Sequence, residues 1–314
     1  MSKISFTLII ACLLSGCAWT SPGGFGQRSA QVEAIKSVVD TLPEEYQLGV
    51  KFALYRAGGN SGALVRALRS VSGEEQEGMA FLITHMPRRD LRSLKADFLI
   101  ENVSLAYQAR RVLPWGADVP PDIFLNYVLP YVNVNETREP WRRYFFEKYA
   151  GLAREQGTIG AAALFLNLRI FTDHHITYNL KTRPKPDQSP SETIAAGVAS
   201  CTGQSIMIAD ALRAVGIPAR VVGTPLWSDR SGNHTWFEVW EDGAWHFQDA
   251  NREGRLDEAW FATPAAEPQM TGPLHRIYAA SYRRTGILFP TIWAPLADDV
   301  YATDVTMDYQ TDAE

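Results

Sequence analysis

Residues 199–215 read ASCTGQSIMIADALRAV, and they predict the helix around which the rest of the core is arranged. Gly216 and Pro218 come directly after it, and both residue types end helices. Ser200 can cap the start, so we expect a helix from Cys201 to Val215. Cys201 then lies in the first turn, where the helix dipole and free N–H groups stabilise a thiolate. Apolar residues spaced three or four apart predict one core-facing stripe: Ile208, Ala211, Leu212 and Val215.

Three strands are expected after this helix. The sequence places them at residues 219–224, 234–240 and 244–249. Asp242-Gly243, between the last two, is a strong signal for a two-residue hairpin turn. Such a turn sets Asp249 opposite Trp236, so His234 and Asp249 become diagonal neighbours on one face of the hairpin.

This geometry brings together the groups that activate a thiol. An adjacent histidine activates a cysteine nucleophile, and a carboxylate orients the imidazole and stabilises its charged form. We therefore predict a catalytic set of Cys201, His234 and Asp249. Asn251 is the alternative orienting residue, since it lies opposite His234 in the same register and a Cys/His/Asn set also works.

Composition excludes several classes of protein. The chain has 314 residues, 46% of them hydrophobic, which is enough to bury a large core. A net charge of −5 and the lack of a polybasic tract argue against nucleic-acid binding. Two of the three cysteines lie in the first 17 residues, which excludes a disulfide scaffold or a Cys-rich zinc site in the body. His174-His175 with Cys201 and His234 matches no strong metal signature, so we expect no metal or cofactor.

The first residues indicate an export signal. Lys3 precedes an apolar run that is too short to span a bilayer. Leu14-Ser15-Gly16-Cys17 then resembles the lipobox of bacterial lipoproteins, in which the cysteine becomes the lipid-carrying N-terminus. The alternative is an ordinary secretory signal. We expect lipid attachment at Cys17 and a place in the bacterial cell envelope, at the outer membrane or cell surface if the cell is Gram-negative.

The rest of the chain divides by its patterning. After a signal at 1–17 and a flexible tether at 18–28, apolar periodicity predicts a helical domain at 29–157. A mixed core is expected at 158–260. The segment 261–314 is predicted as a β extension, whose strands either complete the core sheet or begin a further module. The fold class is thus α+β, with an all-α region before the core.

Residues 189–251 resemble the transglutaminase-like superfamily. The segments that carry the likeness are Pro190-Ser191-Glu192-Thr193, Cys201, residues 211–220, His234 to Val239, and Trp245 with Asp249. The resemblance implies a papain-like core, with the cysteine helix packed on an antiparallel sheet, and acyl transfer through a thioester. It also implies an oxyanion site made by the Cys201 N–H and one side chain. Gln188 is the candidate donor, or an exposed loop residue with no role.

Two further predictions concern the substrate. Trp227 and Trp236 either wall the cleft or simply pack within the sheet. The substrate is expected to be a peptide or protein amide. An anchored bacterial chain with a single cysteine in its body favours hydrolysis over transfer, and the lack of an acidic calcium-type loop argues against a calcium-switched transglutaminase. The alternatives are a protein cross-linking transglutaminase and a non-catalytic binding module at the cell surface.

Overall fold

The computed structural model describes residues 32–267, 272–295, 297 and 299–310. The predicted signal and tether, with Cys17, lie outside the described residues. Within the described part, none of the helices is both long and apolar enough for a membrane span.

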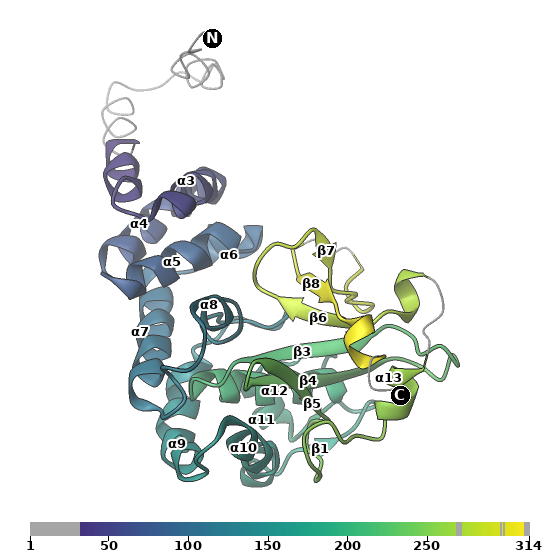
Figure 1. The fold of residues 1–314 in the computed structure, drawn as a ribbon. Coiled ribbons are helices and arrows are strands. Elements are labelled where there is room, and N and C mark those ends of the chain that lie inside the picture. The colour runs from purple at the N-terminus through teal and green to yellow at the C-terminus, as the bar shows by residue number, and fades with distance from the viewer. Residues whose placement is uncertain (1–31, 268–271, 296, 298, 311–314) are drawn as a thin grey trace.

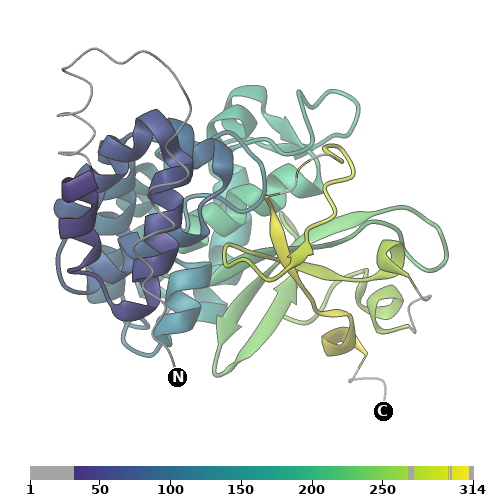
Figure 2. The ribbon, with the colours of Figure 1, turned by 90° about the horizontal axis from the view of Figure 1, so that it is seen from above.

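The first half of the described chain is helical. Helices gather on one side of the molecule and the sheet on the other (Figures 1 and 2). Residues 32–39 are helical, and the elements that follow are α3 (Glu44–Ala57), η2 (Gly58–Asn60), α4 (Ser61–Arg69), α5 (Glu74–His85), α6 (Arg88–Ser93), α7 (Ala96–Val112), α8 (Pro121–Tyr127), α9 (Trp141–Glu155) and α10 (Ile159–Asp173). The α+β class is confirmed, with the helical region first.

The second half carries the sheet. Its elements are β1 (Thr177–Tyr178), α11 (Pro190–Ala196), β2 (Val198–Ala199), α12 (Cys201–Ala214), β3 (Ala219–Thr224), β4 (His234–Glu241), β5 (Ala244–Gln248), α13 (Ala262–Ala266), η3 (Pro273–His275), β6 (Tyr278–Ser281), β7 (Ile287–Leu288), β8 (Tyr301–Asp304) and η4 (Thr306–Tyr309). The larger sheet has the order β5-β4-β3-β6-β8-β7, and its neighbouring strands in the described part of the chain pair antiparallel.

The hairpin has the register that the sequence predicts. Phe237 pairs with Gln248, and Glu241 pairs with Ala244. Asp242 and Gly243 both have positive φ, at 50° and 89°, as a type I′ turn requires. Strands β6 and β8 join β3, so the C-terminal segment completes the core sheet.

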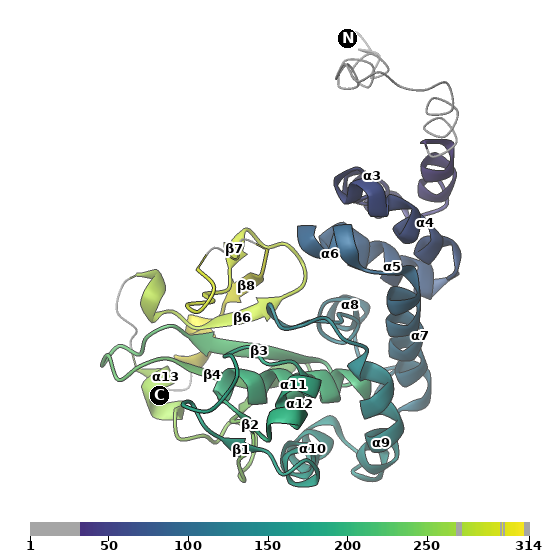
Figure 3. The ribbon, with the colours of Figure 1, turned by 180° about the vertical axis from the view of Figure 1, so that it is seen from behind.

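Helix α12 lies at the centre of the core. It contacts β3 and β4 and also the helices α9, α10 and α11, and it lies behind the sheet in Figure 1 and in front of it in Figure 3. The bounds agree with the predicted helix to within one residue. The predicted stripe of Ile208, Ala211, Leu212 and Val215 is buried, and burial extends further than the stripe, because every residue from Thr202 to Ala214 is buried. A helix enclosed on all sides must also satisfy its polar side chains internally.

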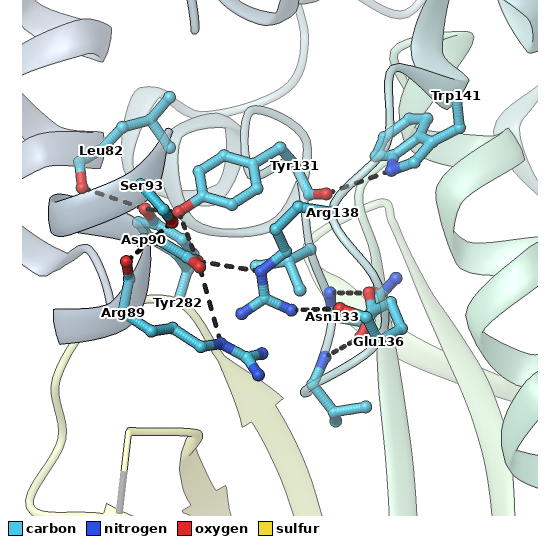
Figure 4. Close-up of polar contacts among 12 residues, drawn as sticks. Leu82, Arg89, Asp90, Ser93, Tyr131, Asn133, Glu136, Arg138, Trp141 and Tyr282 are labelled. Atoms are coloured by element: carbon cyan, nitrogen blue, oxygen red, sulfur yellow. Dashed lines mark hydrogen bonds and ion pairs between the residues drawn. The ribbon is translucent and has the colours of Figure 1, made fainter. Parts of the chain in front are cut away.

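Buried polar contacts join the helical region to the sheet (Figure 4). The Tyr131 hydroxyl donates to Asp90 at 2.9 Å, and Arg138 Nε donates to the same carboxylate at 2.9 Å. Tyr282, which follows β6, donates to the carbonyl of Leu82 in α5 at 3.0 Å. The strand segment that completes the sheet is therefore fixed to the helices as well.

Candidate active site

Cys201 is the first residue of α12 and is partly exposed. The short strand β2 leads into it and pairs in parallel with β1, which sets Tyr178 beside Ala199. The expected cap does not form. The Ser200 hydroxyl instead donates to the carbonyl of Pro186 at 3.1 Å, which fixes the approach of the chain to the helix.

His234 is the first residue of β4, and its backbone pairs with Thr224 of β3. Its Nε2 lies 3.1 Å from Oδ1 of Asp249, as the diagonal register predicts. The ring stacks on Trp236 and also contacts Trp260 and Phe261, with centroids 4.8 and 5.1 Å away. These rings hold the imidazole in place and shield its bond to Asp249 from water.

A hydrogen bond links the thiol of Cys201 to the imidazole of His234. Because Nε2 faces Asp249, Nδ1 is the ring nitrogen left for the sulfur. Burial raises the pKa of Cys201, but the hydrogen bond and charge of His234 outweigh it, and the net pKa lies below the usual value. Burial lowers the pKa of His234, yet the bonds to Asp249 and Cys201 raise it to about 9. Both shifts favour a thiolate–imidazolium pair at neutral pH.

Asp249 is held by more than the histidine. Trp260 Nε1 donates to its Oδ2 at 2.9 Å, and the side chain of Asn167 donates to its backbone carbonyl at 3.0 Å. Asn251, the alternative orienting residue, points elsewhere, and its Nδ2 donates to the carbonyl of Ile176 at 3.4 Å. The structure therefore brings Asp249, and not Asn251, to the imidazole.

The amide of Gln188 is held by backbone hydrogen bonds. Its side chain is fully buried, and Nε2 donates to the carbonyl of Val198 at 2.9 Å. An amide nitrogen committed to the backbone of β2 is not free to stabilise an oxyanion. The exposed-loop alternative is wrong because Gln188 is buried, and both contacts of its Nε2 are to backbone carbonyls, those of Val198 and Glu192, which brace the strand that precedes Cys201.

The two tryptophans predicted as cleft walls lie in the core. Trp227 is 2% exposed and Trp236 is fully buried, and their rings stack on each other in a cluster with Phe261. The packing alternative is thus the correct one. Trp236 still matters to the site, because it supports the back of the His234 ring.

A cleft of about 350 Å³ opens beside Cys201. Its walls include Tyr178 from β1 and Trp293 from the segment between β7 and β8. Sequence reasoning missed both residues, and it also missed Trp260, which contacts His234 and Asp249. All three come from segments outside the recognised motif, and only the fold brings them to Cys201.

The described residues contain no group of three or more His, Cys, Asp and Glu side chains that could hold a metal ion. His174 lies at the end of α10, where its Nε2 is 3.1 Å from the hydroxyl of Tyr144. It takes no part in the contacts around Cys201.

Comparison with known proteins agrees with this geometry. The family model of the transglutaminase-like superfamily matches residues 151–250. Residues 151–250 form a transglutaminase-like domain. Cys201, His234 and Asp249 all lie within this transglutaminase-like domain, whereas Trp260 and Trp293 lie beyond it. The family and the site together support a cysteine enzyme.

A solved structure from Cytophaga hutchinsonii, described as a "Putative Cysteine Protease", is similar to part of the chain. The likeness has 22% sequence identity and a TM-score of 0.27, and it covers 34% of this chain and 38% of that chain. No curated protein matches the sequence.

Proposed function

We propose that the protein is a cysteine hydrolase that cleaves amide bonds of peptides or proteins through a thioester. The observation that carries this proposal is the hydrogen-bonded series Cys201–His234–Asp249, which begins at a helix N-terminus and opens on a cleft. Such a series provides a charged nucleophile, a proton donor for the leaving group and an orienting carboxylate.

The reaction follows from the proton positions. The Cys201 thiolate attacks the amide carbonyl carbon, and a C–S bond forms as the oxygen takes up negative charge. The His234 imidazolium gives its proton to the leaving nitrogen, and the C–N bond breaks. Neutral His234 then takes a proton from water, whose oxygen attacks the thioester. The C–S bond breaks, and the acid and the thiolate–imidazolium pair are released.

The oxyanion needs donors in this scheme. The backbone N–H of Cys201 at the start of α12 is one, because the first N–H groups of a helix have no partner within it. The hydroxyl of Tyr178 replaces Gln188 as the proposed side-chain donor. Tyr178 lines the same cleft, and burial followed by the charge of Cys201 raises its pKa, so the hydroxyl keeps its proton at neutral pH.

Hydrolysis and transfer differ in the molecule that resolves the thioester. We expect N-acetylated, C-amidated glutamine peptides to yield acids formed by cleavage or deamidation, even when putrescine is present. Mass spectrometry in heavy-oxygen water distinguishes the acids from a putrescine adduct, because only hydrolysis incorporates the oxygen label. Cys201→Ala is the control.

Two outcomes would contradict this expectation. A putrescine adduct as the main product would make the protein a cross-linking transglutaminase. Peptide binding with no product that depends on Cys201 would make it a non-catalytic module.

We also propose that lipid on Cys17 anchors the protein in the bacterial cell envelope. Support comes from the lipobox-like residues Leu14 to Cys17 alone. Cells fed a clickable palmitate analogue should label the full chain, and Cys17→Ser should remove both the label and the membrane association. Label retained in Cys17→Ser would refute the anchor.

A further inference from the structure

The cleft beside Cys201 is lined by both apolar and basic side chains. Tyr178, Leu180, Ile292 and Trp293 supply apolar and aromatic surface, and Arg183 supplies a guanidinium. Arg183 is the one basic residue among the described residues that line the cleft, and no carboxylate lies among them. The cleft therefore presents a cation next to apolar surface, within reach of the nucleophile.

Arg183 has no ion pair or side-chain hydrogen bond among the contacts of the described residues. Its neighbour Lys185 behaves differently, since Lys185 Nζ lies 2.9 Å from Glu192 and also donates to Thr137 at 2.9 Å. The charge of Arg183 acts within the cleft. Burial and then the charge of Cys201 raise the pKa of Tyr178, and the charge of Arg183 lowers it by less. Arg183 is thus a half-buried cation that the described part of the chain leaves unpaired.

Trp293, in the apolar part of the cleft lining, is fixed in position. Trp293 Nε1 donates to the side-chain oxygen of Asn135 at 3.2 Å, and the same N–H is shared with the carboxylate of Asp187. These partners come from the helical region and from the loop before α11, so three separate segments meet at this wall. A fixed apolar surface excludes water and so strengthens the attraction between Arg183 and an anion.

We infer that the cleft selects amide substrates that carry a carboxylate, which pairs with Arg183 while an apolar part of the substrate packs against Trp293. Arg183 is then a specificity residue for the proposed reaction, and the inference rests on the proposed function. An arginine suits this role because its planar guanidinium binds a carboxylate through two parallel hydrogen bonds.

Two small alkylating agents test the inference without a known substrate. Iodoacetate and iodoacetamide have the same reacting carbon and leaving group, but only iodoacetate carries a carboxylate. We expect Arg183→Gln to lower the ratio of the iodoacetate rate to the iodoacetamide rate at Cys201 by about threefold at low salt, from Coulomb attraction at the cleft. Arg183→Lys should keep most of the ratio, and added salt should reduce the difference between wild type and Arg183→Gln.

Arg88→Gln is the matched control, since Arg88 is an exposed arginine at the start of α6 that is absent from the cleft lining. It should leave the ratio unchanged. An equal ratio in wild type and Arg183→Gln would overturn the inference, even if Cys201 reacts fast. Slow alkylation of Cys201 with both reagents in every variant would instead count against the proposed function, so the two failures are distinguishable.

Three peptides of one length identify which carboxylate is recognised. One is capped at both ends and contains glutamine, one is capped and contains glutamate, and one contains glutamine with a free C-terminal carboxylate. Each is used to protect Cys201 from iodoacetamide. If an acidic peptide protects Cys201 better than the capped glutamine peptide does, and Arg183→Gln removes this advantage, the inference is supported. The glutamate peptide then indicates recognition of a side-chain carboxylate, and the peptide with a free C-terminus indicates recognition of a terminal carboxylate. Equal protection by all three contradicts it.

Discussion

Replacing His234 by alanine should lower kcat about a thousandfold or more, and replacing Cys201 by alanine should abolish turnover. His234 holds the proton that the leaving nitrogen requires, and its bond to the sulfur lowers the pKa of the thiol. Tyr178→Phe should have a smaller effect on kcat, because it removes one oxyanion donor and leaves the thiolate intact. The measurement is steady-state kinetics with a capped glutamine peptide that the wild-type protein hydrolyses in the mass-spectrometric assay described above.

His246 offers a matched control for the loss of a histidine. It lies on β5 and forms a pair with Asp257, with Nδ1 2.7 Å from Oδ2, but it is not among the contacts of Cys201 or His234. His246→Ala removes a second His–Asp pair and should leave kcat unchanged. Equal losses in His246→Ala and His234→Ala would show that the effect is structural, and would contradict the assigned role of His234.

Replacing Arg142 by methionine should lower the free energy of unfolding by about 3–5 kcal/mol. Arg142 is buried in α9, and its guanidinium donates to Asn102 and to the carbonyls of Val128, Leu129, Pro130 and Arg213. Burial, with the nearby charge of Arg213, lowers the pKa of Arg142 to about 9, so it remains charged at neutral pH. Methionine fills a similar volume but leaves these acceptors without a donor.

Urea unfolding measures this loss, and the neighbouring residue is the control. Arg143 also lies on α9, but its side chain is 54% exposed and pairs with Glu101 at the surface. Arg143→Met should change stability little, because exposed ion pairs contribute little. Equal destabilisation by the two substitutions would contradict the role assigned to the buried guanidinium.

The parts of the site that the sequence predicts are those fixed by local chemistry. Asp242-Gly243 admits a tight turn, and that turn alone sets the register that makes His234 and Asp249 neighbours. The ends of α12 are likewise predictable, since Gly216 has a φ of 75° and Pro218 follows it. Local sequence signals of this kind predict the observed structure correctly because few tertiary contacts compete with them.

The parts that the sequence does not predict depend on contacts between distant segments. The direction of the Gln188 amide is set by Val198 of β2, and no local pattern reveals it. Trp260 reaches Asp249 only after the chain turns back beyond β5. The wall at Trp293 needs Asn135, which lies 158 residues away in the sequence. A specificity cleft built this way is a product of the fold and carries no signature in the sequence.

The burial of α12 shows a different limit. Its apolar residues fit one stripe, which normally indicates a helix with a solvent-facing side. Asp210 and Arg213 nevertheless lie in the core, where burial raises the pKa of Asp210 well above its usual value. Asn133 donates to Asp210 at 2.8 Å, and Arg213 donates to the carbonyl of Val132 at 2.9 Å. The helical region supplies the partners that make a polar face acceptable inside the protein.

The pH dependence of Cys201 alkylation tests the central claim most directly. A lowered thiol pKa and a histidine pKa of about 9 predict that wild-type Cys201 reacts with iodoacetamide at lower pH than a free peptide thiol does. The profile should change again near pH 9, where His234 loses its proton. His234→Ala should return the profile to that of an ordinary thiol. A wild-type profile that already matches a free peptide thiol, unchanged in His234→Ala, would contradict the account.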